Sequence, residues 1–121
     1  MARILLAEDD AAMLDMVKHT LTADGHTVVA AQDGQEALDL LSAAGAGFDV
    51  MLTDIQMPSV NGIELAGKAM ALLPKLKVVL MSAFTGGVTI PDALKPHIAG
   101  ILSKPLALDQ VRAAVRAAAA G

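Results

Sequence analysis

The stretch VMLTDIQMPSVNG, residues 50–62, starts as a strand and becomes polar at Asp54. Its first residues are apolar without interruption, which is typical of a strand covered on both faces of a sheet. Pro58 and Gly62 then indicate a turn that leads out of the strand. A carboxylate at this place is either a cap or turn residue or a reactive group held at the tip of a strand. The segment alone leaves both interpretations open.

The same organisation continues along the chain on both sides of this stretch. Further apolar runs predict strands at RILLA (3–7), TVVAA (27–31), KVVLMS (77–82) and GILS (100–103). Between and after them, apolar residues recur at helical spacing in 13–21, 34–45, 66–73 and 108–118. Uniformly apolar strands that alternate with helices predict an α/β fold, a doubly wound five-stranded parallel sheet flanked by helices.

One segment does not follow this pattern. FTGGVTIPDALKPHIAG, residues 84–100, should contain the fourth helix, but it carries two adjacent glycines together with Pro91 and Pro96. Pro91 is compatible with a first helical position, whereas Pro96 would end the helix after about two turns. The sequence therefore predicts a short or irregular fourth helix.

The composition restricts the class of protein. The chain of 121 residues is 55% hydrophobic and has a net charge of −4, so we expect one folded domain over residues 1–121. It lacks clusters of basic residues, which argues against nucleic-acid binding. Without cysteine or a long apolar run, it is predicted to be a cytoplasmic protein with no membrane partner.

Polar residues follow the predicted strands at the points where they end. They are Glu8, Asp9, Asp54, Ser82 and Lys104. Because the carboxyl ends of parallel strands share one edge of a sheet, these side chains are expected to meet there. Crowded carboxylates favour a divalent cation, and hard oxygen ligands select Mg²⁺. A lysine and a hydroxyl suit a phosphoryl group, so the residues predict a Mg²⁺-dependent phosphoryl site in which Asp54 can act as nucleophile.

These motifs, in this order, resemble the response-regulator receiver domain over essentially the whole chain. The motifs are Glu8-Asp9, Asp54 with Met57-Pro58 and Gly62, Ser82-Ala83, and Lys104-Pro105. The resemblance implies the strand order 2-1-3-4-5, phosphorylation of Asp54 by a histidine kinase or histidine phosphotransfer protein, and no turnover of an external substrate. It also implies a Mg²⁺ site formed by Asp9, Asp54 and the carbonyl of Gln56, with Glu8 acting through water. Ser82, Ala83 and Lys104 would bind the phosphoryl group, and the bond before Pro105 would be cis.

The chain departs from the family pattern in the residue that usually signals phosphorylation. The family has an aromatic residue in the fifth strand where this chain has Ile101. Phe84, two residues beyond Ser82, is the natural substitute. We therefore expect Phe84 and the loop 84–97 to rearrange on phosphorylation. The alternative is that Phe84 is a fixed cover over the pocket.

The chain also resembles the CpdR-type single-domain regulators of alphaproteobacteria. The resemblance lies in RILLAEDD (3–10), MLTDI (51–55) and LSKP (102–105). It implies output through contacts with a downstream protein target, with a role in cell-cycle control and regulated proteolysis as an adaptor of the ClpXP protease, whose ClpX unfoldase would be the partner.

Two other functions are compatible with an aspartate at a strand tip. One is a phosphatase or phosphotransferase with an aspartyl-phosphate intermediate, but Gln56 stands where such phosphatases need a second acid. The other is an interaction module independent of phosphorylation, which the complete set of strand-end residues disfavours.

The remaining polar residues and the methionines have structural interpretations. Asp10, Asp33 and Asn61 are expected to cap helices or form turns. The methionines are expected to fill the core, and the three histidines to lie at the surface or at helix ends.

Overall fold

The computed structural model describes residues 2–43, 47–57, 59–83 and 89–120. Its parallel sheet has the order β2-β1-β3-β4-β5, which confirms the predicted sheet. The strands are β1 (Arg3–Ala7), β2 (Thr27–Ala31), β3 (Val50–Asp54), β4 (Lys77–Ser82) and β5 (Ile98–Ser103). The helices are α1 (Ala11–Ala23), α2 (Gly34–Ser42), α3 (Gly62–Leu72) and α4 (Leu108–Ala120).

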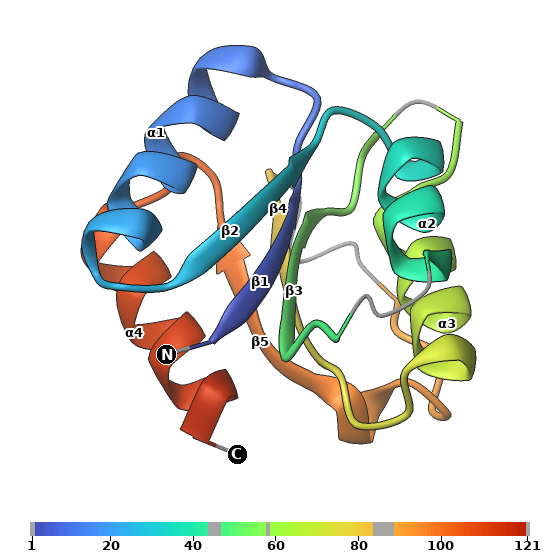
Figure 1. Cartoon of the computed structure of the whole chain (residues 1–121). Coiled ribbons are helices and arrows are strands. Elements are labelled where there is room, and N and C mark those ends of the chain that lie inside the picture. The colour runs from blue at the N-terminus through green and yellow to red at the C-terminus, as the bar shows by residue number, and fades with distance from the viewer. Residues whose placement is uncertain (1, 44–46, 58, 84–88, 121) are drawn as a thin grey trace.

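The sheet is covered by helices on both faces. Figure 1 shows α1 and α4 on one side of it and α2 and α3 on the other. Successive side chains of a strand point to opposite faces, so Met51 packs on the α2–α3 side and Leu52 on the α1–α4 side. Both are fully buried, as is most of β3. This two-sided burial explains why the central strands are apolar throughout.

Three helices begin at a polar residue that caps them. The Asp10 carboxylate accepts hydrogen bonds from the backbone N–H groups of Ala12 and Met13 at the start of α1. Asp33 and Asn61 do the same for α2 and α3, at 2.8 and 2.9 Å. A cap of this kind satisfies backbone donors that the first turn leaves without partners. The predicted structural roles of these residues are confirmed.

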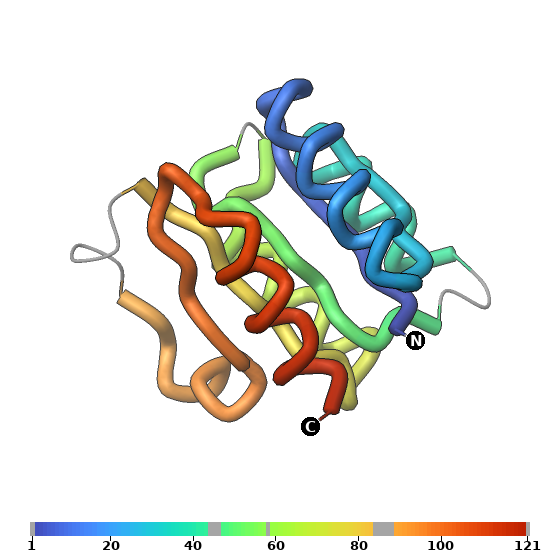
Figure 2. The backbone as a smooth tube through the Cα atoms, turned by 90° about the vertical axis from the view of Figure 1, so that its left-hand side faces the viewer, coloured from blue at the N-terminus to red at the C-terminus, as the bar shows by residue number. Residues whose placement is uncertain are grey.

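The connection between β4 and β5 contains no α-helix in its described residues, 83 and 89–97. A short 3₁₀ helix, η2 (Lys95–His97), is the regular element there, which agrees with the predicted irregular fourth helix. Figure 2 shows residues 89–97 outside the β5 edge of the sheet. Leu94 is 6% exposed and anchors this segment in the core on the α2–α3 side.

Strand β5, which follows these described residues without an α-helix, is less buried than its neighbour β4. Residues of β5 alternate between half-buried and exposed, unlike the buried β3 and β4. Ile101 pairs with Leu80, and it is 42% exposed although Leu80 is fully buried. An irregularity in the pairing at Val78/Val79 places Ile98 in β5, so the strand starts two residues earlier than GILS predicted.

Two glycines allow close approaches around the end of β3. A Cβ atom on Gly62, the first residue of α3, would lie 2.3 Å from the carbonyl oxygen of Asp54. One on Gly34 would lie 2.1 Å from the carbonyl oxygen of Val60. Both distances are far shorter than a carbon–oxygen contact permits, so only glycine fits at either position. The starts of α3 and α2 therefore pack closely on Asp54 and Val60, respectively.

One predicted core residue lies elsewhere. Met16 was expected on the buried face of its helix, but it is 42% exposed. The buried stripe of α1 runs through Leu14, Val17, Thr20 and Leu21, and Met16 falls outside it. The methionines of the strands, Met51 and Met81, are fully buried as predicted.

Candidate phosphoryl and metal site

Lys104, just beyond β5, joins carboxylates from two other strand ends. Its Nζ lies 2.7 Å from Glu8 Oε1 and 2.7 Å from Asp54 Oδ2. Glu8 is fully buried and Asp54 is 3% exposed, whereas 21% of the Lys104 side chain is exposed. Buried carboxylates need a partner of opposite charge, and this ammonium supplies it to both. Asp54 therefore accepts an ion pair through Oδ2, while its Oδ1 also makes the local turn contact that its sequence context allowed.

The register of the sheet explains this convergence. Asp54 pairs with Met81, so Ser82 is the next residue at the end of the neighbouring strand. The backbone N–H of Lys104 then donates to the carbonyl oxygen of Ser82 at 2.9 Å. The Lys104–Pro105 peptide bond is cis, the form that the resemblance implies. Each predicted strand-end residue thus reaches the same edge through the hydrogen-bonded ladder.

The third carboxylate of the site belongs to Asp9. Oxygen atoms of Glu8, Asp9 and Asp54 lie within 4.8 Å of one another. Partial desolvation raises the pKa of the Asp9 carboxyl above its ordinary value of 3.8, and a hydrogen bond with Glu8 and the nearby Glu8 charge raise it further. A backbone hydrogen bond and the Lys104 charge lower this pKa. Burial and the neighbouring carboxyl group of Glu8 therefore disfavour the charged form of Asp9 more than these two effects favour it.

Lys104 itself is held in the charged form. Burial lowers the pKa of its ammonium, but the hydrogen bonds to Asp54 and Glu8 and their charges more than offset this. The net effect raises the pKa of Lys104 above its ordinary value of 10.5. A permanent positive charge therefore stands beside the Asp54 carboxylate at neutral pH.

The donor set suits a magnesium ion. When ionised, the three carboxylates and the ammonium sum to −3 + 1 = −2, the charge that a divalent cation balances. All the side-chain donors are hard oxygens, which Mg²⁺ prefers, and Asp9 is exposed so that water can complete a coordination shell. The residues present fit this cation.

Ser82 and Gln56 form a second polar contact beside Asp54. The Ser82 hydroxyl, which is fully buried, donates to Gln56 Oε1 at 3.2 Å. The backbone N–H of Gln56 donates to Asp54 Oδ1 at 3.2 Å. Ala83, the next predicted phosphoryl-binding residue, is exposed at the end of β4. The sequence placed Ser82 and Gln56 in the site, but their direct hydrogen bond depends on tertiary structure and leaves no pattern in the sequence.

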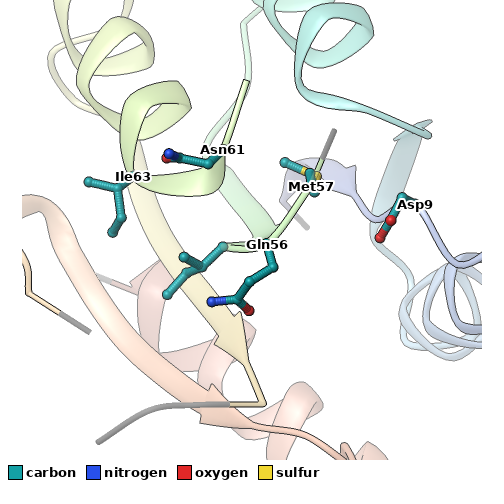
Figure 3. Close-up of a pocket in the computed structure, with 6 residues that line it drawn as sticks. Asp9, Gln56, Met57, Asn61 and Ile63 are labelled. Carbon is teal, nitrogen blue, oxygen red and sulfur yellow. The ribbon is translucent and has the colours of Figure 1, made fainter. Parts of the chain in front are cut away.

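A pocket of about 500 Å³ opens over this edge of the sheet. Figure 3 shows Asp9 on one side of it and Gln56, Asn61 and Ile63 on the other. Ile55 and Met57 complete the lining. Sequence reasoning assigned Met57 to a family motif and Asn61 to a cap, and it did not identify Ile55 or Ile63 as pocket residues. Of the three carboxylates of the site, the pocket is lined by that of Asp9.

The two predicted switch residues have different outcomes. Phe84 lies outside the described residues, so its predicted rearrangement stays a prediction. Ile101 is on β5, where it is 42% exposed on the side that no α-helix covers among the described residues. The predicted role of Ile101 in the switch stays a prediction.

Comparison with known proteins identifies relatives for this arrangement. The family model described as "Response regulator receiver domain" matches residues 4–116. The response regulator receiver protein CpdR of Brucella abortus (strain 2308) is 39% identical over 108 residues, which cover 89% of this chain and 88% of that protein. The response regulator MprA of Mycolicibacterium vanbaalenii is 30% identical over 95% of this chain, which spans only 49% of MprA.

A solved structure with the same fold is a complex with Mg²⁺-BeF. The response regulator protein TrrA from Thermotoga maritima, in complex with Mg²⁺-BeF, has a TM-score of 0.81 to this chain. The two are 25% identical, and the alignment covers 98% of this chain and 99% of TrrA. No helix in the described part of this chain has the length and apolar character needed to cross a bilayer.

Proposed function

The chain belongs to the response regulator receiver domain family, and from that premise we propose that it is a switch controlled by phosphorylation of Asp54. The observation that carries the proposal is the pair of 2.7 Å contacts from Lys104 to Glu8 and Asp54. They place an ammonium beside a buried carboxylate, and the next two residues after Asp54 line a pocket. An ammonium at this place would stabilise the negative charge of a phosphoryl group on Asp54.

The proposed reaction is phosphoryl transfer from a phosphohistidine on a histidine kinase or phosphotransfer protein. An oxygen of Asp54 attacks phosphorus and forms a P–O bond. The P–N bond breaks at the same time, and the electron pair of the P–N bond leaves with the imidazole. Lys104 meets the charge on the phosphoryl oxygens, and the Ser82 hydroxyl donates a hydrogen bond to one of them. Asp9, Asp54 and the Gln56 carbonyl would hold Mg²⁺, with Glu8 acting through water. When bound, the cation neutralises charge on the transferring group.

The product would be a signalling state and not an intermediate of turnover. Gln56 stands two residues after Asp54, and an amide cannot act there as the general acid or base that rapid hydrolysis needs. We therefore place the output in protein–protein contacts in the cytoplasm. Similarity to CpdR supports a further proposal, a role in cell-cycle control or in regulated proteolysis with a ClpX-type unfoldase as the downstream partner.

Acetyl phosphate tests the central proposal. With Mg²⁺, the intact mass should increase by one phosphoryl group, and Asp54→Asn should remain unmodified. Asp33→Asn is the matched control, because Asp33 caps α2 and is not one of the three clustered carboxylates, so the substitution should not prevent modification. A wild-type chain that is never modified would support a phosphorylation-independent module, and rapid multiple turnover of acetyl phosphate would support an enzyme.

A further inference from the structure

The Gln56 side chain holds the hydroxyl that the proposed phosphoryl group needs. Ser82 Oγ donates to Gln56 Oε1 at 3.2 Å, and the backbone N–H of Gln56 donates to Asp54 Oδ1 at the same distance. One residue therefore contacts both the carboxylate that would be phosphorylated and the hydroxyl beside it. Ser82 is fully buried, so its hydroxyl hydrogen cannot be shared with bulk water.

A serine hydroxyl has a single hydrogen to donate. The hydrogen that Ser82 gives to Gln56 is not available to a phosphoryl oxygen on Asp54. We propose that the Gln56 side chain is a competitive latch, a positioning residue that holds Ser82 in the unphosphorylated state and must release it when a phosphoryl group arrives. The inference rests on the proposed phosphorylation of Asp54 and adds a residue that opposes it.

The surroundings decide which partner moves. Gln56 is an exposed residue that lines the open pocket in Figure 3, so its amide can turn toward water and regain hydrogen bonds there. The backbone of Ser82 is held in the sheet, because its carbonyl oxygen accepts the N–H of Lys104 at 2.9 Å. Release therefore turns the Gln56 amide toward water and makes the Ser82 hydroxyl available to a phosphoryl oxygen.

The latch has a definite effect on affinity. A hydrogen bond between neutral groups contributes about 1 kcal/mol net, which corresponds to about a fivefold change in an equilibrium constant. A side chain of similar length that accepts hydrogen bonds only weakly should therefore raise the affinity for a phosphoryl mimic by about that factor. If Gln56 only shaped the pocket, the effect of replacing it would not depend on the presence of the Ser82 hydroxyl.

Calorimetric titration with beryllofluoride and Mg²⁺ tests this without any hydrolysis step. Gln56→Met should bind beryllofluoride about fivefold more tightly than the wild type. In the Ser82→Ala background the same substitution should have no effect, because the hydroxyl is gone. Gln35→Met is the matched control, since Gln35 is exposed and bonded to Asp39 in α2. Its affinity should equal that of the wild type.

Two results would overturn the latch. Weaker binding by Gln56→Met would mean that the amide assists the phosphoryl group, and an equal gain in the Ser82→Ala background would mean that Gln56 acts independently of Ser82. Failure of the proposed function has a different signature, because neither the wild type nor Gln56→Met would then bind beryllofluoride.

Discussion

The crossover from β3 to α3 and the connection from β4 to β5 begin alike and continue differently. Each starts with a buried strand that ends in a polar site residue, Asp54 in one and Ser82 in the other. After β3 the chain forms α3, which Asn61 caps and which packs closely on the strand end. After β4, the residues that the structure describes form only a turn and the short helix η2 before β5.

The difference shows that Ser82 and Lys104 reach the site without an α-helix in the described residues that connect their strands. Ser82 and Lys104 meet the acidic residues through the ladder of the sheet even though the connection between them is irregular. What the irregular connection does change is the exposure of β5, most clearly at Ile101. The connection after β3 contributes Gln56 to the site, whereas β5, after the other connection, has exposed residues.

The largest expected effect on stability comes from replacing Lys104 at the site, compared with Lys95 in the β4–β5 connection. Lys104→Met should lower the free energy of unfolding by about 3 kcal/mol, because it leaves Glu8 and Asp54 buried without their counter-charge. Lys95→Met, in the β4–β5 connection, removes an exposed pair with Asp92 and should cost about 0.5 kcal/mol or less. Urea denaturation at pH 7 measures both. Similar losses for the two variants would contradict the comparison.

The pH dependence of the Lys104 effect has a definite sign. The pKa of Lys104 is raised in the folded state, so its stabilising contribution is fully present below the ordinary value of 10.5. That contribution is lost as the pH rises through the raised pKa. The chain has no tyrosine or cysteine, so these groups do not titrate in the same range. The advantage of the wild type over Lys104→Met should therefore stay constant from neutral pH to about pH 9 and shrink at higher pH.

The next effect concerns glycines. Gly62→Ala should cost about 2 kcal/mol, because its Cβ would meet the Asp54 backbone at 2.3 Å and backbone atoms cannot yield easily. Gly100→Ala in β5 has open space around the new Cβ and should be close to neutral. Gly67→Ala, inside α3 and also unobstructed, should stabilise by about 0.5–1 kcal/mol. Thermal unfolding distinguishes the three, and a neutral Gly62→Ala would show that the strand end tolerates displacement.

The smallest effect is expected on the open face of β5. Ile101→Thr should lower stability by about 0.5 kcal/mol, because Ile101 is already 42% exposed. The same substitution at Ile55, which is 7% exposed directly after β3, should cost about 2 kcal/mol. Denaturation curves recorded side by side test this. A large loss at Ile101 would mean that the residue is covered by part of the chain.

Sequence reasoning was most successful where one physical pattern determines the structure. Uninterrupted apolar runs gave the central strands, and the polar residues after them gave the site, since parallel strands must end at one edge. Sequence reasoning failed where the burial or pairing of a residue depends on the elements that pack against it. Met16 has helical spacing but lies outside the buried stripe of α1, and Ile98 joins β5 through an irregular pairing. The hydrogen bond between Ser82 and Gln56 and the positive φ of Ser59, 65°, follow from tertiary packing.

The bridge made by Lys104 also bears on folding. Lys104 is 96 positions from Glu8 and 50 from Asp54, and it follows the edge strand of the sheet. Contacts this distant in sequence require the chain to close long loops, which costs conformational entropy. A nascent or partly unfolded chain can have the three carboxylates in place and still lack the ammonium. The proposed phosphorylation of Asp54 would then require the completed fold. Local unfolding of β5 alone would remove Lys104 from the site while the rest of the core stays folded.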